Sequence, residues 1–146
     1  MVALLKEMDV IRSVCKYLKT EKQYKIESSV ENVYDHDVDI VATSPKLKIR
    51  LCVEAKGQTS SKTKSRRFGN EFNPNQKKDH FAKALLKSCQ YLSEDKGQVA
   101  GIALPDDTVD RELVDSIIGV LEQLGISIFL VKKNKTVRMT IGNLPL

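Results

Sequence analysis

Three residues in the first half of the chain have the types and spacing that metal-dependent hydrolysis needs. They are Asp39, Glu54 and Lys56. Carboxylates are hard oxygen ligands suited to Mg²⁺, and a metal held by them can polarise a phosphate and help generate hydroxide from bound water. A lysine beside such a metal can position that water or stabilise the charge that develops on phosphorus. We therefore take these three side chains as candidate catalytic residues.

A third acid, Glu7, is a candidate because of its place on the opening helix. The helical spacing of Leu4, Met8, Ile11 and Leu18 produces an apolar stripe, and Glu7 falls inside it. An ionised carboxylate that faces a core is costly unless it is paired or binds a metal. The alternative is an edge residue that extends to solvent or pairs with a lysine.

The elements predicted around these residues bring them together. Residues 47–56 alternate between apolar and polar side chains, which predicts a strand with Glu54 and Lys56 on the same face. Residues 38–43 predict the preceding strand, and a turn joins the two, so Asp39 is expected close to this pair. The alternative is an exposed cross-strand ladder of salt bridges on a solvated face. A second Glu-x-Lys at 94–96 lacks a strand and a preceding Asp, and we set it aside.

The rest of the chain predicts an α/β fold. We expect helices at 2–19, from about 73 to 97 and at 107–124, and strands at 24–30, 38–43, 47–56, 98–104, 126–132 and 136–141. Asn73-Pro74-Asn75-Gln76 is typical of a helix start, with Asn as N-cap, Pro in the first position and Gln completing a capping box. The order α-β-β-β-α-β-α-β-β predicts antiparallel hairpins followed by a parallel β-α-β unit. A central mixed sheet flanked by helices, in one domain spanning 1–146, is the expected architecture.

Composition narrows the class of protein. The 146 residues are 41% hydrophobic and 29% charged, which favours a folded core, and no apolar run approaches the roughly 20 residues of a membrane helix. The first residues become charged too soon for a signal peptide, so we expect a soluble cytoplasmic protein without membrane partners. Cys15, Cys52 and Cys89 are far apart, which argues against disulfides and structural zinc.

The positive charge is concentrated in one segment. The chain carries 24 basic and 19 acidic residues, a net charge of +5. Residues 56–78 hold seven basic residues and one acid, leaving 17 basic and 18 acidic residues elsewhere. Such a segment suits a polyanion such as nucleic acid, although a solvated loop would have the same composition. The candidate contacts are Lys62, Lys64, Arg66 and Arg67 for the backbone, and Gln58 and Gln76 for DNA or a metal-bound water.

These motifs resemble the PD-(D/E)xK nuclease superfamily, which has a restriction-endonuclease-like core. The matching segments are Val38-Asp39-Ile40-Val41 and Cys52-Val53-Glu54-Ala55-Lys56-Gly57, and the element order is similar as well. Val38 stands where the eponymous Pro would be, which departs from the pattern, and Asp37 competes with Asp39 because both share strand parity. We prefer Asp39 because a core strand continues from it.

The resemblance, which extends to archaeal Holliday-junction resolvases, implies a Mg²⁺-dependent endonuclease of DNA, with Mn²⁺ as a substitute metal. In this family the Asp and the Glu bind the metal, the Lys assists the attacking water and a Glu in the first helix supports metal binding. Those roles would fall on Asp39, Glu54, Lys56 and Glu7, with the carbonyl of Ala55 as a further ligand. Because one active site cuts one strand, the resemblance implies a homodimer if both DNA strands are cut. The alternatives are a nucleic-acid-binding module without catalysis and an accessory subunit whose Glu54 and Lys56 only form salt bridges.

Overall fold

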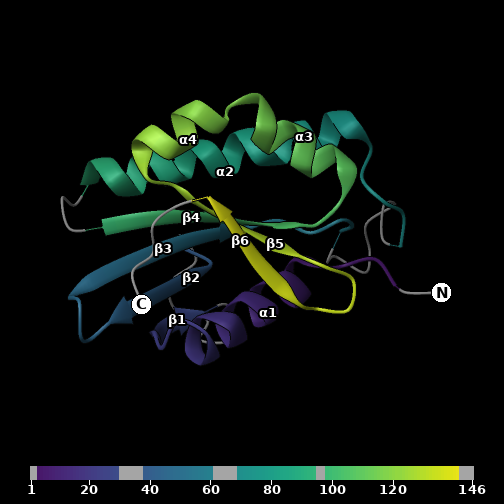
Figure 1. The fold of residues 1–146 in the computed structure, drawn as a ribbon. Coiled ribbons are helices and arrows are strands. Elements are labelled where there is room, and N and C mark those ends of the chain that lie inside the picture. The colour runs from purple at the N-terminus through teal and green to yellow at the C-terminus, as the bar shows by residue number, and fades with distance from the viewer. Residues whose placement is uncertain (1–2, 30–37, 61–68, 95–97, 142–146) are drawn as a thin grey trace.

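The computed structural model describes residues 3–29, 38–60, 69–94 and 98–141, which form a six-stranded sheet between two layers of helices (Figure 1). In chain order the elements are α1 (Glu7–Thr20), β1 (Lys25–Ser29), β2 (Ile40–Ser44), β3 (Ile49–Ala55), α2 (Pro74–Glu94), β4 (Gln98–Pro105), α3 (Thr108–Ser116), α4 (Ile118–Leu124), β5 (Ser127–Val131) and β6 (Val137–Ile141). Neighbouring strands follow the chain order, with β3–β4 and β4–β5 parallel and the other pairs antiparallel. This confirms the predicted α/β fold with a mixed sheet.

Both faces of the sheet are covered by helices. Figure 1 shows α1 below the sheet and α2, α3 and α4 above it. The side chains of Leu51, Val53 and Ala55 point from β3 into the core between the sheet and α1. Cys52, the intervening residue, packs on the other face against Tyr91 of α2. Because residues alternate along a strand, Glu54 shares the α2 face with Cys52.

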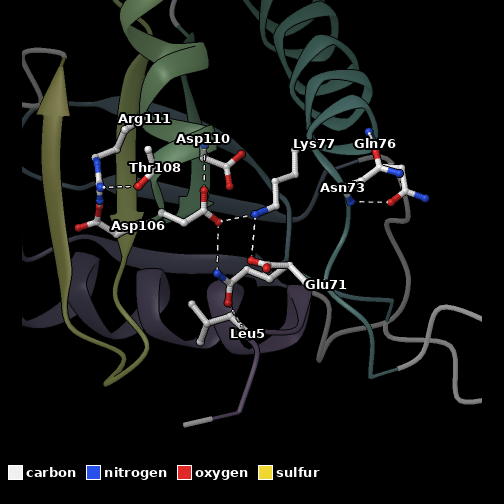
Figure 2. Close-up of polar contacts among 11 residues, drawn as sticks. Leu5, Glu71, Asn73, Gln76, Lys77, Asp106, Thr108, Asp110 and Arg111 are labelled. Carbon is white, nitrogen blue, oxygen red and sulfur yellow. Dashed lines mark hydrogen bonds and ion pairs between the residues drawn. The ribbon is translucent and has the colours of Figure 1, made fainter. Parts of the chain in front are cut away.

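The start of α2 follows the predicted cap in detail. The Gln76 N–H donates to Asn73 Oδ1 at 2.9 Å, and the Asn73 N–H donates to Gln76 Oε1 at 2.8 Å (Figure 2). Pro74 occupies the first helical position, where its missing N–H leaves no bond unmade. The capping-box prediction is confirmed, and it assigns the Gln76 side chain a structural role.

Two helix boundaries differ from the prediction. The helix expected at 107–124 is divided at Ile117, whose φ of −130° and ψ of 25° lie outside the helical region. Two adjacent β-branched residues, Ile117 and Ile118, occupy this break, and such side chains favour helix less than unbranched ones. At the other end, α1 begins at Glu7 rather than at residue 2, because the backbone of Leu5 bonds to Gln58 instead of continuing the helix.

The three cysteines form no disulfide bonds. Cys15, Cys52 and Cys89 are present as thiols and not as disulfides, as their spacing predicts. Within the described ranges, no helix combines the length and the apolar character needed to cross a bilayer.

Candidate active site

Asp39 and Glu54 lie opposite each other across the β2–β3 pair. Ile40 pairs with Val53 in this antiparallel ladder, and continuing the register by one residue sets Asp39 against Glu54. Side chains of directly opposed residues project to the same face of the sheet and are neighbours there. The Ala55 N–H donates to Asp39 Oδ2 at 2.8 Å, which fixes this carboxylate at the end of β3. The predicted proximity of Asp39 to the second motif is confirmed.

Glu54 is enclosed between β3 and α2. Its residue is only 3% exposed, which excludes a solvated salt-bridge ladder on this face. Tyr91 Oη donates a hydrogen bond to Glu54 Oε1, and Lys87 Nζ lies 4.0 Å from the same oxygen. A buried carboxylate thus has a phenol and an ammonium group from α2 as neighbours.

The pKa of Glu54 is raised, and the causes describe its surroundings. Burial is the largest cause, and the negative charge of Asp39 adds to it. The hydrogen bond from Tyr91 opposes the rise, as do the positive charges of Lys87 and Lys56. Glu54 therefore interacts electrostatically with every candidate catalytic side chain on its own sheet face.

Glu7 belongs to the same electrostatic cluster although it comes from α1. Burial raises the pKa of Glu7 to about 7, and the charge of Asp39 is the second cause. The Lys56 ammonium lowers it, and Glu54 raises it further. Asp39 and Lys56 are therefore close enough to act on the pKa of both Glu7 and Glu54. With a pKa of about 7, Glu7 titrates near neutral pH, which is unusual for a carboxyl group.

These carboxylates are electrostatic neighbours rather than a preassembled set of metal ligands. Across the ranges that the structure describes, no three His, Cys, Asp or Glu side chains are grouped as a metal site. The donor set nevertheless fits a hard divalent cation, since it consists of carboxylate oxygens and both burial and mutual repulsion raise the pKa of two of these carboxyl groups. A cation among Glu7, Asp39 and Glu54 would offset that repulsion.

The predicted nucleic-acid contacts fall into three groups. Lys62, Lys64, Arg66 and Arg67 lie outside the described residues. Gln58 is 3% exposed and its amide is engaged inside the protein, so its position is that of a structural residue rather than of a surface contact. Gln76 is half-buried and completes the α2 cap.

The segment that carries the basic residues starts and ends beside the acidic cluster. The Phe72 N–H donates to the Gln58 carbonyl at 2.8 Å, and Thr59 Oγ1 donates to the Asn70 carbonyl at 2.8 Å. The two ends of residues 60–70 are thus tied together a few residues after Lys56.

One basic residue of this region does not belong to a basic surface. Lys77 is buried, with Nζ at 2.9 Å from Asp107 and 3.1 Å from Glu71 (Figure 2). Its charge is balanced inside the protein and is not available to a polyanion.

Sequence reasoning missed Tyr91 and Lys87 as neighbours of the acidic cluster. Helical periodicity indicates only a packing role for Tyr91, and nothing in the pattern distinguishes Lys87 from other lysines. A signal for Tyr91 exists, because a tyrosine on the inward face of a helix needs a partner for its hydroxyl and Glu54 is the acid on the facing strand. Lys87 lies one turn before Tyr91, so the helical repeat brings it to the same carboxylate.

Neither a scan against protein-family models nor a search of curated proteins finds a match to this chain. The chemistry of the acidic cluster is therefore the basis for assigning a function.

Proposed function

We propose that this protein is a metal-dependent endonuclease that hydrolyses phosphodiester bonds in DNA. The observation that carries the proposal is the meeting of three carboxylates and a lysine from α1 and from the adjoining ends of β2 and β3, where the charges of Asp39 and Lys56 act, besides burial, on the pKa of Glu7 and of Glu54. Buried like charges of this kind are unfavourable in a purely structural role and are found where a cation or a substrate completes the site. The resemblance to PD-(D/E)xK nucleases assigns the same residues to catalysis.

In this proposal each side chain has a separate task. Asp39 and Glu54 hold Mg²⁺, or Mn²⁺ in its place, with the Ala55 carbonyl as a further ligand. When bound, the metal polarises the scissile phosphate and lowers the pKa of its water. Lys56, half-buried just after the end of β3, orients the attacking water and donates hydrogen bonds to the charge that develops on phosphorus.

Glu7 and the α2 residues adjust the charge of the site. Glu7 is close to half protonated near neutral pH, so a bound cation would favour its ionised form and gain a third carboxylate. Tyr91 and Lys87 both favour the ionised form of Glu54, the form that a metal requires. These groups thus oppose the effect of burial on the central ligand.

The proposed substrate contact is the basic segment between Thr59 and Asn70. This segment supplies four positive charges, those of Lys62, Lys64, Arg66 and Arg67. On either side of it, Thr59 and Asn70 are hydrogen-bonded to each other, and Thr59 is three residues after Lys56. Such charges position a nucleic-acid backbone without reading its sequence. A cytoplasmic location and a homodimer that cuts both strands complete the proposal.

The central test is nicking of supercoiled plasmid with Mg²⁺. Asp39→Asn and Glu54→Gln should each reduce nicking by at least about a thousandfold, as the loss of a metal ligand does. Lys56→Ala should reduce the rate with DNA binding retained. The matched control is Glu94→Gln, in the second Glu-x-Lys of the chain, which lies on the exposed end of α2 and should nick like wild type.

Binding in EDTA separates the alternatives. If wild type binds DNA with a steep loss of affinity as salt rises but nicks no DNA or RNA, the protein is a binding module without catalysis. If wild type also shows no salt-sensitive binding to nucleic acid, the protein is an accessory subunit in which Glu54 and Lys56 only form salt bridges. If the protein cleaves RNA but not plasmid DNA, the proposed mechanism stands and the proposed substrate becomes RNA.

A further inference from the structure

Gln58 joins the segment before α1 to the end of the sheet. Its side-chain oxygen accepts a hydrogen bond from the Leu5 N–H at 3.0 Å, and its own backbone N–H donates to the Leu5 carbonyl at 2.7 Å. Its side-chain nitrogen donates to Asp107 Oδ2 at 3.2 Å. Every described bond of this buried amide is thus made to a residue distant in the chain.

Asp107, the acceptor for Gln58, is itself held in place from two sides. It caps α3 by accepting the Asp110 N–H at 2.9 Å, and Lys77 Nζ lies 2.9 Å from its other oxygen. Burial works against ionisation of Asp107, but the bonds from Asp110, Lys77 and Gln58 lower its pKa overall. Lys77 also pairs with Glu71 at 3.1 Å (Figure 2). The Gln58 amide is therefore anchored to α2 and α3.

Gly57 allows the same segment to approach closely. A Cβ at this position would lie 2.5 Å from Glu7 N, 2.8 Å from Lys6 C and 3.0 Å from the Leu5 carbonyl oxygen. No side chain fits in that space, so the backbone of residues 5–7 rests directly on the strand end that follows Lys56. Glu7 is two residues from the Leu5 bonds and in contact with Gly57.

We propose that Gln58 is a positioning residue for Glu7. Its amide fixes the backbone of Leu5 against the end of β3 and so sets where the first turn of α1 presents the Glu7 carboxylate to Asp39 and Glu54. The inference rests on the proposed function, since a metal bound by these acids is what the position of Glu7 serves. Groups that orient metal ligands in this way commonly change metal affinity or activity by tenfold or more.

The fold does not depend on Gln58 alone. The Leu5 side chain is 2% exposed and packs in the core between the sheet and α1. This packing holds the segment before α1 to the protein even without the Gln58 amide. Removing the amide should therefore loosen the position of Glu7 while the chain stays folded. This difference makes the positioning role separable from a structural one.

The test is Ca²⁺ binding to the full chain by titration calorimetry, with Ca²⁺ as a metal that binds without supporting cleavage. Gln58→Met keeps the side-chain volume and removes both amide bonds, and it should weaken Ca²⁺ binding about tenfold. Glu7→Gln should weaken it by a similar factor. Because Gln58 acts through Glu7, adding Gln58→Met to Glu7→Gln should weaken binding no further. Exchange of the Leu5 amide hydrogen should accelerate in Gln58→Met.

Each outcome decides between the two claims. Equal weakening by Gln58→Met in wild type and in Glu7→Gln would overturn the positioning role, as would wild-type affinity in Gln58→Met. A wild-type protein that binds no Ca²⁺ would overturn the metal site and the positioning role together. Ca²⁺ binding without nicking of any nucleic acid would overturn only the nuclease, and the double-mutant comparison would still judge Gln58.

Discussion

Tyr91 Oη lies 2.5 Å from Glu54 Oε1, so the phenol of α2 donates directly to the buried carboxylate of β3. This bond lowers the pKa of Glu54 and opposes the larger effect of burial. The same contact raises the pKa of Tyr91, because burial and the neighbouring carboxylate both disfavour a phenolate. The phenol therefore keeps its proton, and its hydrogen bond favours the ionised form of the residue that would hold the metal.

Removing the Tyr91 hydroxyl should make nicking more dependent on pH. In Tyr91→Phe the pKa of Glu54 rises further, so a larger fraction of Glu54 is protonated at neutral pH and the metal competes with a proton. We expect a loss of about tenfold at pH 7 that shrinks toward pH 9, measured as the rate of plasmid nicking against pH. An equal loss at every pH would contradict this explanation.

Tyr24→Phe is the matched control for the hydroxyl. Tyr24 is also buried, and its hydroxyl has no hydrogen-bond partner among the described residues. Its removal should leave the pH profile of nicking unchanged.

Lys77 should be important for stability although it belongs to the basic region. Lys77→Met leaves the carboxylates of Asp107 and Glu71 without their buried partner, which commonly destabilises by about 3 kcal/mol. For a chain of this size that corresponds to a melting temperature lower by roughly 6–12 °C. Lys78→Met, one residue later on the exposed side of α2, should shift the melting temperature little. Equal melting curves for the two variants would refute the internal role of Lys77.

Asp110 should make the protein less stable as the pH rises. Burial raises the pKa of Asp110 to about 8, and the charge of Asp107 and the hydrogen bond between the two carboxyl groups add to the rise. The folded state then holds its proton more tightly than the unfolded state, so stability falls from about pH 4 to about pH 8. Asp110→Asn removes this loss. It should raise the free energy of unfolding at pH 9 by a few kcal/mol, since each unit of difference between the folded and unfolded pKa contributes about 1.4 kcal/mol.

The measurement for Asp110 is urea unfolding at pH 5 and pH 9. The stabilisation by Asp110→Asn should be large at pH 9 and smaller at pH 5, where the wild-type carboxyl is neutral. Asp115→Asn, on the exposed side of the same helix, is the control and should show no such pH dependence. A gain that is the same at both pH values would exclude titration of Asp110 as its cause.

Two glycines should respond to alanine in opposite ways. Gly57→Ala forces a methyl group into the backbone of Lys6 and Glu7, which should destabilise by about 1–3 kcal/mol and displace Glu7. Gly119 lies in α4 and has nothing within 4 Å of the position that a methyl group would take, so Gly119→Ala should stabilise by up to about 1 kcal/mol. Chemical denaturation measures both, and a neutral Gly57→Ala would show that the segment before α1 is not pressed against the strand.

The features that were predicted correctly are those that local pattern determines. Alternation over 47–56 was enough to predict β3 with Cys52 and Glu54 on one face, and the Asn-Pro-x-Gln pattern was enough to locate the start of α2. The register between Asp39 and Glu54 was predicted only approximately, because a turn joins the strands and its length allows a shift.

The features that were missed depend on contacts between distant segments. The sequence predicts a surface contact for Gln58, because nothing near it in the chain shows that Leu5 and Asp107 satisfy its amide. The late start of α1 has the same cause, since the Leu5 backbone is bonded to Gln58. The Tyr91–Glu54 bond likewise requires knowing how α2 crosses the sheet. Polar groups inside a fold are matched by tertiary structure, which hydrophobic periodicity does not report.

The bonds Thr59–Asn70 and Gln58–Phe72 join the chain on either side of the stretch between them. For a closed loop in general, doubling the length costs only about 0.6 kcal/mol of closure entropy. Under the proposed nuclease function, a replacement of this stretch by one of another length should alter the preference among nucleic-acid shapes while the acids on the sheet stay unchanged.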